Sequence, residues 1–226
     1  MRAFVSFSGG KESVFAFFHA LRQGIKVEVL FTMLNSKGKK TRGHGLHKDL
    51  IMAQAQALRV PVVFANASWR RYEETFKRVL RRFRANGIEA GVFGDLYLEE
   101  HREWVERVCN EVGLKPILPL WGQDPDGLLQ EFLSHGFKAV LVAIKDQRIP
   151  VELLGKFLEE EVIKSLKEIG VDPCGERGEY HTLVVDGPLF SRSLSIEAFK
   201  KRKGKKGIFL EILKFTLLDK DTSVSL

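Results

Sequence analysis

Two glycines near the amino terminus join a short apolar run directly to a segment of helical periodicity. The apolar run, residues 3–7, is typical of a buried strand, and residues 11–23 carry apolar side chains at helical spacing. Between the two patterns stand Ser8, Gly9, Gly10, Lys11, Glu12 and Ser13. A helix N-terminus presents unpaired N–H groups and a partial positive charge, and glycine allows close approach of the backbone. This junction therefore predicts a phosphate-binding loop at the start of an α/β sheet.

Strand and helix patterns alternate over the first two-thirds of the chain. Strands are expected at residues 3–7, 26–33, 60–65, 90–93, 117–120 and 138–144. Helices are expected between them, at residues 46–58, 69–84, 98–112 and 124–135. Such alternation predicts a doubly wound parallel sheet with helices on both faces.

The pattern changes after about residue 149. Residues 151–169 are predicted to form one long helix, and residues 193–200 and 208–217 alternate as the two arms of a hairpin would. We therefore expect two domains, an α/β domain at residues 1–147 and a smaller C-terminal α+β domain at residues 148–226.

Composition places the chain among ordinary globular proteins. Of its 226 residues 44% are hydrophobic and 29% charged, and the net charge is +7. No apolar run approaches the ~20 residues of a membrane span, and the first residues lack the long apolar core of a signal peptide. We expect a cytoplasmic protein without a membrane contact. Cys109 and Cys174 are too few for a disulfide scaffold and lack the paired spacing of a zinc site.

The loop at residues 8–13 resembles the SGGxDS signature of the PP-loop ATP pyrophosphatases, and matches neither the Walker A loop nor the dinucleotide pattern GxGxxG. The resemblance implies that ATP and Mg²⁺ are the cofactors and that Ser8, Gly9, Gly10, Lys11, Glu12 and Ser13 grip the departing pyrophosphate. Glu12 stands where that family usually has Asp. Its carboxylate would reach Mg²⁺ from a longer arm, and Asp95 is the second candidate metal ligand.

A second cluster of chemical groups lies at residues 174–182. Two carboxylates, an arginine, a tyrosine, a histidine and a threonine surround two glycines there, whereas a solvated loop before a strand would need few of them. The loop at 8–13, the strand end at 92–95, the turn at 119–121 and GERGEYHT at 175–182 together resemble the diphthine–ammonia ligases, over residues 1–190. Arg177 departs from the family, which usually has a glycine at this position.

The resemblance implies an amidation. Diphthine is a modified histidine of translation elongation factor 2 that carries a carboxylate and a trimethylammonium group. ATP would convert the carboxylate into an acyl-adenylate with release of pyrophosphate, and ammonia, present as ammonium, would then displace AMP. Candidate catalytic residues are Asp95, Glu176, Glu179 and His181. The last three could accept the ammonium proton, and the two glutamates could instead hold the trimethylammonium group with Tyr180.

Two other functions are compatible with the same motifs. A PP-loop enzyme that modifies tRNA would suit the basic charge, but its thiolating members generally need reactive or metal-binding cysteines. A nucleotide-binding protein without catalysis would keep the loop and not convert ATP to AMP. A homo-oligomer and a nucleic-acid contact are compatible with the sequence, and neither is required.

Several weaker features of the sequence can be explained by a structural or solvent-exposed role. His44 and His47 could close over ATP, but solvated loop histidines are the favoured reading, in a loop expected to be mobile. Both cysteines are expected to be structural. The basic turn at residues 200–206 could dock an acidic protein surface or RNA, or simply be solvated.

Overall fold

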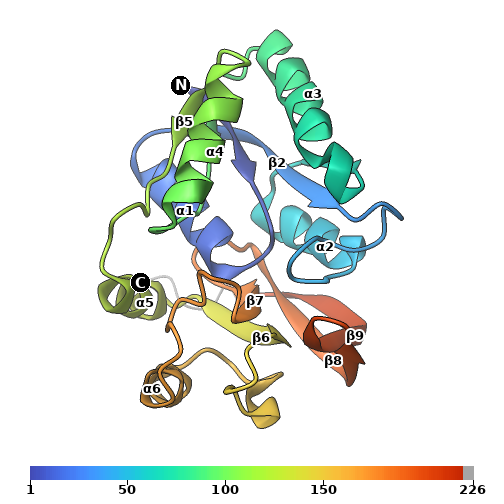
Figure 1. Ribbon diagram of the computed structural model, residues 1–226, viewed down its shortest axis with the longest axis vertical. Helices are drawn as coiled ribbons and strands as arrows, with labels where there is room; N and C mark the ends of the chain where they lie inside the picture. Colours follow the sequence, from blue (N-terminus) through green and yellow to red (C-terminus); the bar gives the residue numbers. More distant parts are fainter. Residues whose placement is uncertain (221–226) are drawn as a thin grey trace.

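A parallel sheet of five strands forms the first half of the chain (Figure 1). The structure is a computed structural model that describes residues 1–220. The strands are β1 (Arg2–Ser6), β2 (Lys26–Leu34), β3 (Val62–Asn66), β4 (Ala90–Val92) and β5 (Lys115–Ile117). Their order is β3-β2-β1-β4-β5, and every neighbouring pair is parallel. The predicted doubly wound parallel sheet is confirmed for these strands.

Helices cover both faces of this sheet, because apolar side chains of its strands point alternately to one face and to the other. The helices are α1 (Lys11–Arg22), α2 (Lys48–Leu58), α3 (Tyr72–Ala85) and α4 (Glu99–Asn110). Ala3 and Val5 of β1 pack in one cluster with α1 and α2, whereas Phe4 packs in a second cluster with α3 and α4. This alternation of β1 is the period-two pattern of a strand that is buried on both faces.

An antiparallel sheet of four strands lies in the second half of the described chain. Its strands, in spatial order, are β7 (Tyr180–Asp186), β6 (Lys138–Ile144), β9 (Gly207–Asp219) and β8 (Arg192–Gly204). The predicted hairpin is confirmed as β8 and β9. The expectation that residues 138–144 continue the parallel sheet is wrong. A continuous apolar run shows that a strand is buried on both faces, but it does not show which sheet the strand joins.

The long helix expected at residues 151–169 is also wrong. The segment forms a short 3-10 turn, η2 (Val151–Leu153), and a shorter helix, α6 (Glu160–Glu168). Between them the backbone pairs with β6: Gly155 N–H donates to Leu141 O at 2.9 Å, and Leu158 N–H donates to Ala139 O at 2.7 Å. Pairing with a buried strand therefore overrides the helical pattern.

The connection between the two sheets carries the remaining helix, α5 (Pro125–Ser134). As predicted, Asp124 caps it and accepts a hydrogen bond from Gly127 N–H at 2.7 Å, with Pro125 in the first turn. No helix within residues 1–220 is long and apolar enough to cross a bilayer.

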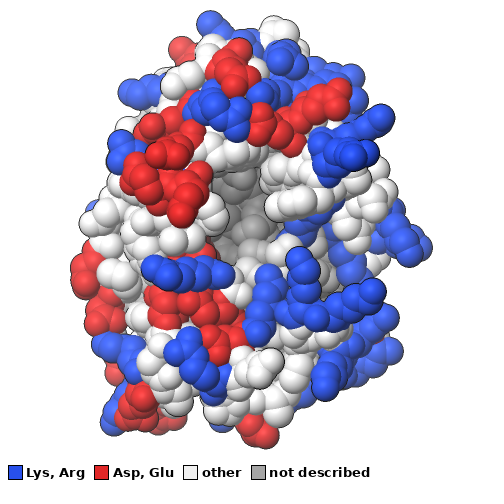
Figure 2. All heavy atoms as spheres, in the orientation of Figure 1, with Lys and Arg blue, Asp and Glu red and all other residues white. Residues whose placement is uncertain are grey.

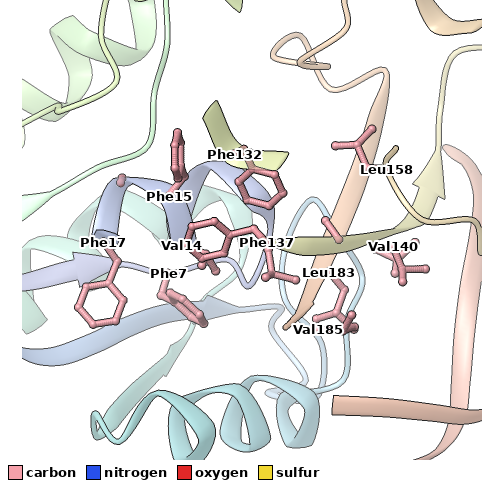
Figure 3. Packing of buried hydrophobic residues seen from close by; sticks show 14 of the residues in the cluster. Phe7, Val14, Phe15, Phe17, Phe132, Phe137, Val140, Leu158, Leu183 and Val185 are labelled. Carbon is pink, nitrogen blue, oxygen red and sulfur yellow. The ribbon is translucent and has the colours of Figure 1, made fainter. Parts of the chain in front are cut away.

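The two sheets share one hydrophobic cluster. Phe15 of α1 packs edge-on against Phe132 of α5 and Phe137, at centroid distances of 5.5 and 5.7 Å. Figure 3 shows this contact continuing to Leu183 and Val185 of β7. Because β6 already belongs to the second sheet, the sheets divide before residue 138. The predicted division into domains at residues 1–147 and 148–226 stays a proposal. The last residues of the second predicted domain, 221–226, lie outside the described part of the chain.

Candidate active site between β1 and β4

The candidate site lies where the order of the parallel strands reverses. From β1 the chain proceeds outward to β2 and β3, and it then crosses back to β4 on the other side of β1. Ligand crevices of doubly wound sheets occur at this switch point, beyond the carboxyl ends of the strands. Residues 8–13 follow β1 and residues 93–95 follow β4. A Cβ atom on Gly94 would lie only 2.7 Å from the Glu12 carbonyl oxygen, so the two segments adjoin directly.

The loop after β1 is held in shape by its own hydroxyl groups. Gly9 has a φ of +81°, a conformation that favours glycine. The Ser13 hydroxyl donates to Gly10 O at 3.0 Å and accepts from Ser8 N–H at 3.2 Å. Gly10 N–H donates to Ser8 Oγ at 3.2 Å. The loop is thus preorganised at the N-terminus of α1, as the sequence predicts.

Strand β7 of the second sheet supports this loop from behind. Val184 N–H donates to Gly9 O at 2.9 Å, and Lys11 N–H donates to Thr182 Oγ1 at 3.0 Å. The fully buried Gln54 of α2 donates from Nε2 to Gly9 O and Val184 O, at 2.9 and 2.7 Å. This role of Gln54 was not predicted, because glutamine is usually an exposed residue.

The second motif folds over the first. Lys11 is buried and donates from Nζ to Cys174 O at 2.5 Å, with the Tyr180 ring centroid 4.8 Å away. Its Nζ also forms an ion pair with Glu12. Burial lowers the pKa of Lys11, but Glu12, Tyr180 and Cys174 together raise it above its ordinary value, so Lys11 stays charged. Lys11 thereby ties the loop to residues 174–182.

Carboxylates from both motifs converge on a cavity of about 220 Å³. Ligand atoms of Asp95, His101 and Glu176 lie within 4.8 Å of one another. The Glu176 carboxylate accepts from Leu96 N–H at 3.0 Å, and its pKa is raised to about 7, chiefly by burial. Glu12 also lines the cavity, and its buried Oε1 is the atom that forms the ion pair with Lys11 Nζ. Oxygen ligands of this kind suit Mg²⁺, so the residues present fit that ion.

A second group at the cavity consists of His44 and His181, which line it, and Lys145, which lies beside His181. His181 Nε2 lies 2.5 Å from Lys145 Nζ, and the ring centroids of His181 and His44 lie 4.3 Å apart with the ring planes tilted by 31°. Burial, followed by neighbouring positive groups, lowers the pKa of His181 strongly and that of His44 to about 3. The reading of His44 as a solvated loop histidine is wrong, because its ring packs against Gly10 and His181. Lys145 was not predicted, although it directly follows a buried strand.

Of the remaining residues that the sequence singles out, only Cys174 lines the cavity. Glu179 does not line it, and its carbonyl oxygen accepts from the N–H groups of Lys145 and Asp146. Arg177 is exposed. His47 caps α2 through Asp49 N–H. Cys109 and Cys174 are buried, which raises the pKa of each thiol to about 12.

The face around this site is divided by charge. In Figure 2 the surface is hollowed at its centre, with acidic side chains gathered on the α4 side and basic side chains on the side of the β8–β9 hairpin. The predicted basic turn at 200–206 forms the tip of that hairpin. A polyanionic ligand in the hollow would therefore find its counter-charges on one side.

A parallel sheet with a Gly-Gly loop at its switch point, closed over by an ionisable segment from a second sheet, defines a nucleotide-binding α/β protein of the PP-loop type. The chain belongs to the diphthamide synthase family: the model of its N-terminal domain matches residues 1–116, and that of its C-terminal domain matches residues 124–218.

The curated relatives bear names of one activity. The diphthine–ammonia ligase of Schizosaccharomyces pombe is 30% identical over 209 residues, which cover 83% of this chain and 34% of that protein. The ligases of Mus musculus and Danio rerio are 26% and 29% identical, and the matches cover 84% and 87% of those proteins and 88% of this chain. The prediction of an enzyme of the ligase class is confirmed by these matches.

One solved structure also aligns. It is described as a predicted subunit of tRNA methyltransferase from Methanocaldococcus jannaschii, and it covers 83% of this chain and 98% of its own at 18% identity. Its TM-score of 0.45 is too low to support a conclusion.

Proposed function

We propose that this chain amidates diphthine on translation elongation factor 2 at the expense of ATP. The observation that carries the proposal is the meeting of the two motifs in one cavity, joined by Lys11, in a chain of the diphthamide synthase family. In the first step a carboxylate oxygen of diphthine attacks the α-phosphorus of ATP. The bond from that phosphorus to the bridging oxygen breaks, and pyrophosphate leaves with the electron pair.

The loop at the N-terminus of α1 is the proposed pyrophosphate site. The hydroxyl groups of Ser8 and Ser13 and the helix N-terminus supply donors and positive potential to the leaving group. Lys145, held beside His181, adds a cation that does not belong to the loop motif. Positive charge from two separate segments would stabilise the charge that develops on pyrophosphate.

Asp95 and Glu12 are the proposed holders of Mg²⁺, with Glu176 beside Asp95. Bound there, the ion would neutralise phosphate charge and act as a Lewis acid. Lys11 forms an ion pair with Glu12 and restrains its side chain.

Ammonia is proposed to complete the reaction. Its lone pair attacks the acyl carbon, AMP leaves with the electrons of the carbon–oxygen bond, and one proton must pass from nitrogen to an acceptor. Glu176 is the proposed acceptor, because its carboxylate faces the cavity and is fixed by Leu96 N–H. His181 is better suited to hold Lys145 in place, since its ring nitrogen already contacts that ammonium group.

The decisive test uses the elongation factor itself. Diphthine-bearing elongation factor 2 is incubated with the protein, ATP, Mg²⁺ and ammonium chloride, and the modified peptide is sequenced by mass spectrometry. Conversion of the acid to the amide, with one AMP formed for each amide, is the expected result. Formation of ADP instead of AMP, or AMP release without amide, would contradict the proposal. AMP formation that requires added tRNA instead of the elongation factor would point to the tRNA-modifying alternative.

A further inference from the structure

A second cavity, of about 530 Å³, opens beside the first and is called here the aromatic pocket. Its walls carry the rings of Trp69, Tyr72, Phe76, Phe93 and Trp104. It shares Ser6, Phe93, Asp95 and His101 with the cavity at the loop. A ligand seated in the aromatic pocket could therefore extend a reactive group toward the nucleotide without leaving the protein.

The rings form a continuous aromatic surface. Trp69 and Tyr72 lie 5.5 Å apart between centroids, Tyr72 and Trp104 6.0 Å, and Trp104 and Phe76 5.1 Å. The helix expected at residues 69–84 begins later in the structure than the sequence pattern predicts. Helix α3 begins at Tyr72, and Trp69 precedes it in a 3-10 turn, η1 (Trp69–Arg71), with 76% of its surface exposed. A tryptophan at the rim of a cavity is available to a ligand that arrives from solvent.

Charges of opposite sign stand at different parts of this pocket. The Arg42 guanidinium lies over the rings of Trp69 and Tyr72, 5.1 and 5.6 Å from their centroids, and its buried Nε has no hydrogen-bond partner. Asp95 and Glu100 are the carboxylates of the pocket. Within residues 1–220 the exposed Glu100 forms neither an ion pair nor a hydrogen bond.

We propose that the aromatic pocket binds a quaternary ammonium group that carries a carboxylate close by, that is, a betaine. A quaternary ammonium ion has no N–H group, so a protein holds it by aromatic faces and nearby carboxylates instead of hydrogen bonds. Trp69, Tyr72 and Trp104 supply the aromatic faces, and Glu100 supplies the negative charge. The unpartnered Nε of Arg42 supplies a donor for the carboxylate.

The placement of the pocket agrees with a substrate borne on another protein. Its rim, at Trp69 and Glu100, is exposed, so a long side chain could enter from solvent. Its inner wall, at Asp95 and His101, is shared with the cavity where ATP is proposed to react. The assignment of diphthine as the natural betaine rests on the proposed function, whereas the preference for the betaine chemistry does not.

The test measures binding of glycine betaine without any turnover. Titration calorimetry compares glycine betaine with 3,3-dimethylbutanoate, which has the same shape and the carboxylate but lacks the positive charge. We expect betaine to bind more tightly than this neutral-headed analogue. Trp69→Leu should weaken betaine binding by about threefold to thirtyfold, the range of a cation–π contact. Glu100→Gln should weaken it too, and the adjacent exposed Glu99→Gln, outside the pocket, is the matched control.

Competition with AMP separates the proposal from the main alternative, an adenine site. Betaine binding that persists in saturating AMP supports the proposal. Displacement of betaine by AMP, together with loss of AMP affinity in Trp69→Leu, overturns it. Equal affinity for betaine and its analogue, or no betaine binding, also overturns it. Amidation by the unmodified chain with an unchanged KM for the elongation factor in Trp69→Leu would reject this pocket and leave the proposed function intact.

Discussion

Lys145 Nζ and His181 Nε2 lie 2.5 Å apart, so the ring nitrogen must accept from the ammonium group and the imidazole must be neutral. The neighbouring ring of His44 is also neutral, since burial lowers its pKa to about 3. The two rings are thus part of the folded structure only in their neutral form, in which each imidazole carries a single N–H group.

Stability should therefore fall as the solution is acidified. Below about pH 6.5 the unfolded chain binds protons at both histidines, whereas the folded chain does not bind one at His44 until about pH 3. Each histidine should remove on the order of 1 kcal/mol of unfolding free energy per pH unit within that window. His44→Asn should flatten the slope, measured by urea unfolding from pH 7 to pH 4. An identical slope in the variant would show that His44 titrates normally.

Lys11→Met should destabilise the fold by about 3 kcal/mol, because it leaves the partly buried Glu12 carboxylate without its ion pair. The double variant Lys11→Met with Glu12→Gln should recover much of this loss, since no unpaired charge remains. Urea unfolding of the two single variants and the double variant measures the coupling. Additive losses would mean that the pair does not interact.

Gln54→Leu should lower the free energy of unfolding by about 1–3 kcal/mol, because two buried hydrogen bonds to Gly9 O and Val184 O are lost. It should also weaken ATP binding, since Gly9 belongs to the loop. The control is Gln56→Leu, an exposed position on the same helix. Similar losses in both variants would argue against a specific role for Gln54.

Ser13→Ala should weaken binding of ATP and pyrophosphate by roughly tenfold and leave AMP binding nearly unchanged, because its hydroxyl organises the pyrophosphate end of the loop. Calorimetry with the three ligands separates these effects. Ser134→Ala removes a comparable serine-to-carbonyl bond on α5 and serves as the control. Equal loss of affinity for ATP and AMP would place the loop elsewhere on the nucleotide.

Glu176→Gln should slow amide formation by about a hundredfold, the loss expected when a proton acceptor is removed. Diphthine-dependent exchange of pyrophosphate into ATP should persist, because Gln can still accept from Leu96 N–H. Glu179→Gln, at a carboxylate outside the cavity, is the comparison. Loss of the exchange reaction in Glu176→Gln would assign this residue to the first step.

The sequence pattern correctly predicted those parts of the fold that depend on interactions between residues close together in the chain. The strand-to-helix turn at Gly9, the cap at Asp124 and the β8–β9 hairpin all follow from neighbouring residues. The sheet joined by β6 and the strand-like pairing at Gly155 depend on partners far along the chain, which periodicity does not encode.

The candidate site shows the same division. The sequence motifs pointed to the loop at residues 8–13 and to Asp95, Glu176 and His181. In the structure, side chains of that loop and these three residues line one cavity. Lys145, Gln54 and His44 have no motif of their own, because each acts through a contact that only the tertiary fold creates. Their roles in the reaction stay predictions.

Through the hydrogen bond from Val184 N–H to Gly9 O, the proposed nucleotide loop near the amino terminus depends on a strand from the second sheet. When only the first half of the chain has emerged from the ribosome, the loop at residues 8–13 lacks its contact with β7. We therefore expect competence for ATP to arise late in synthesis, and a gene split between the two sheets to yield active protein only when its two products reassemble.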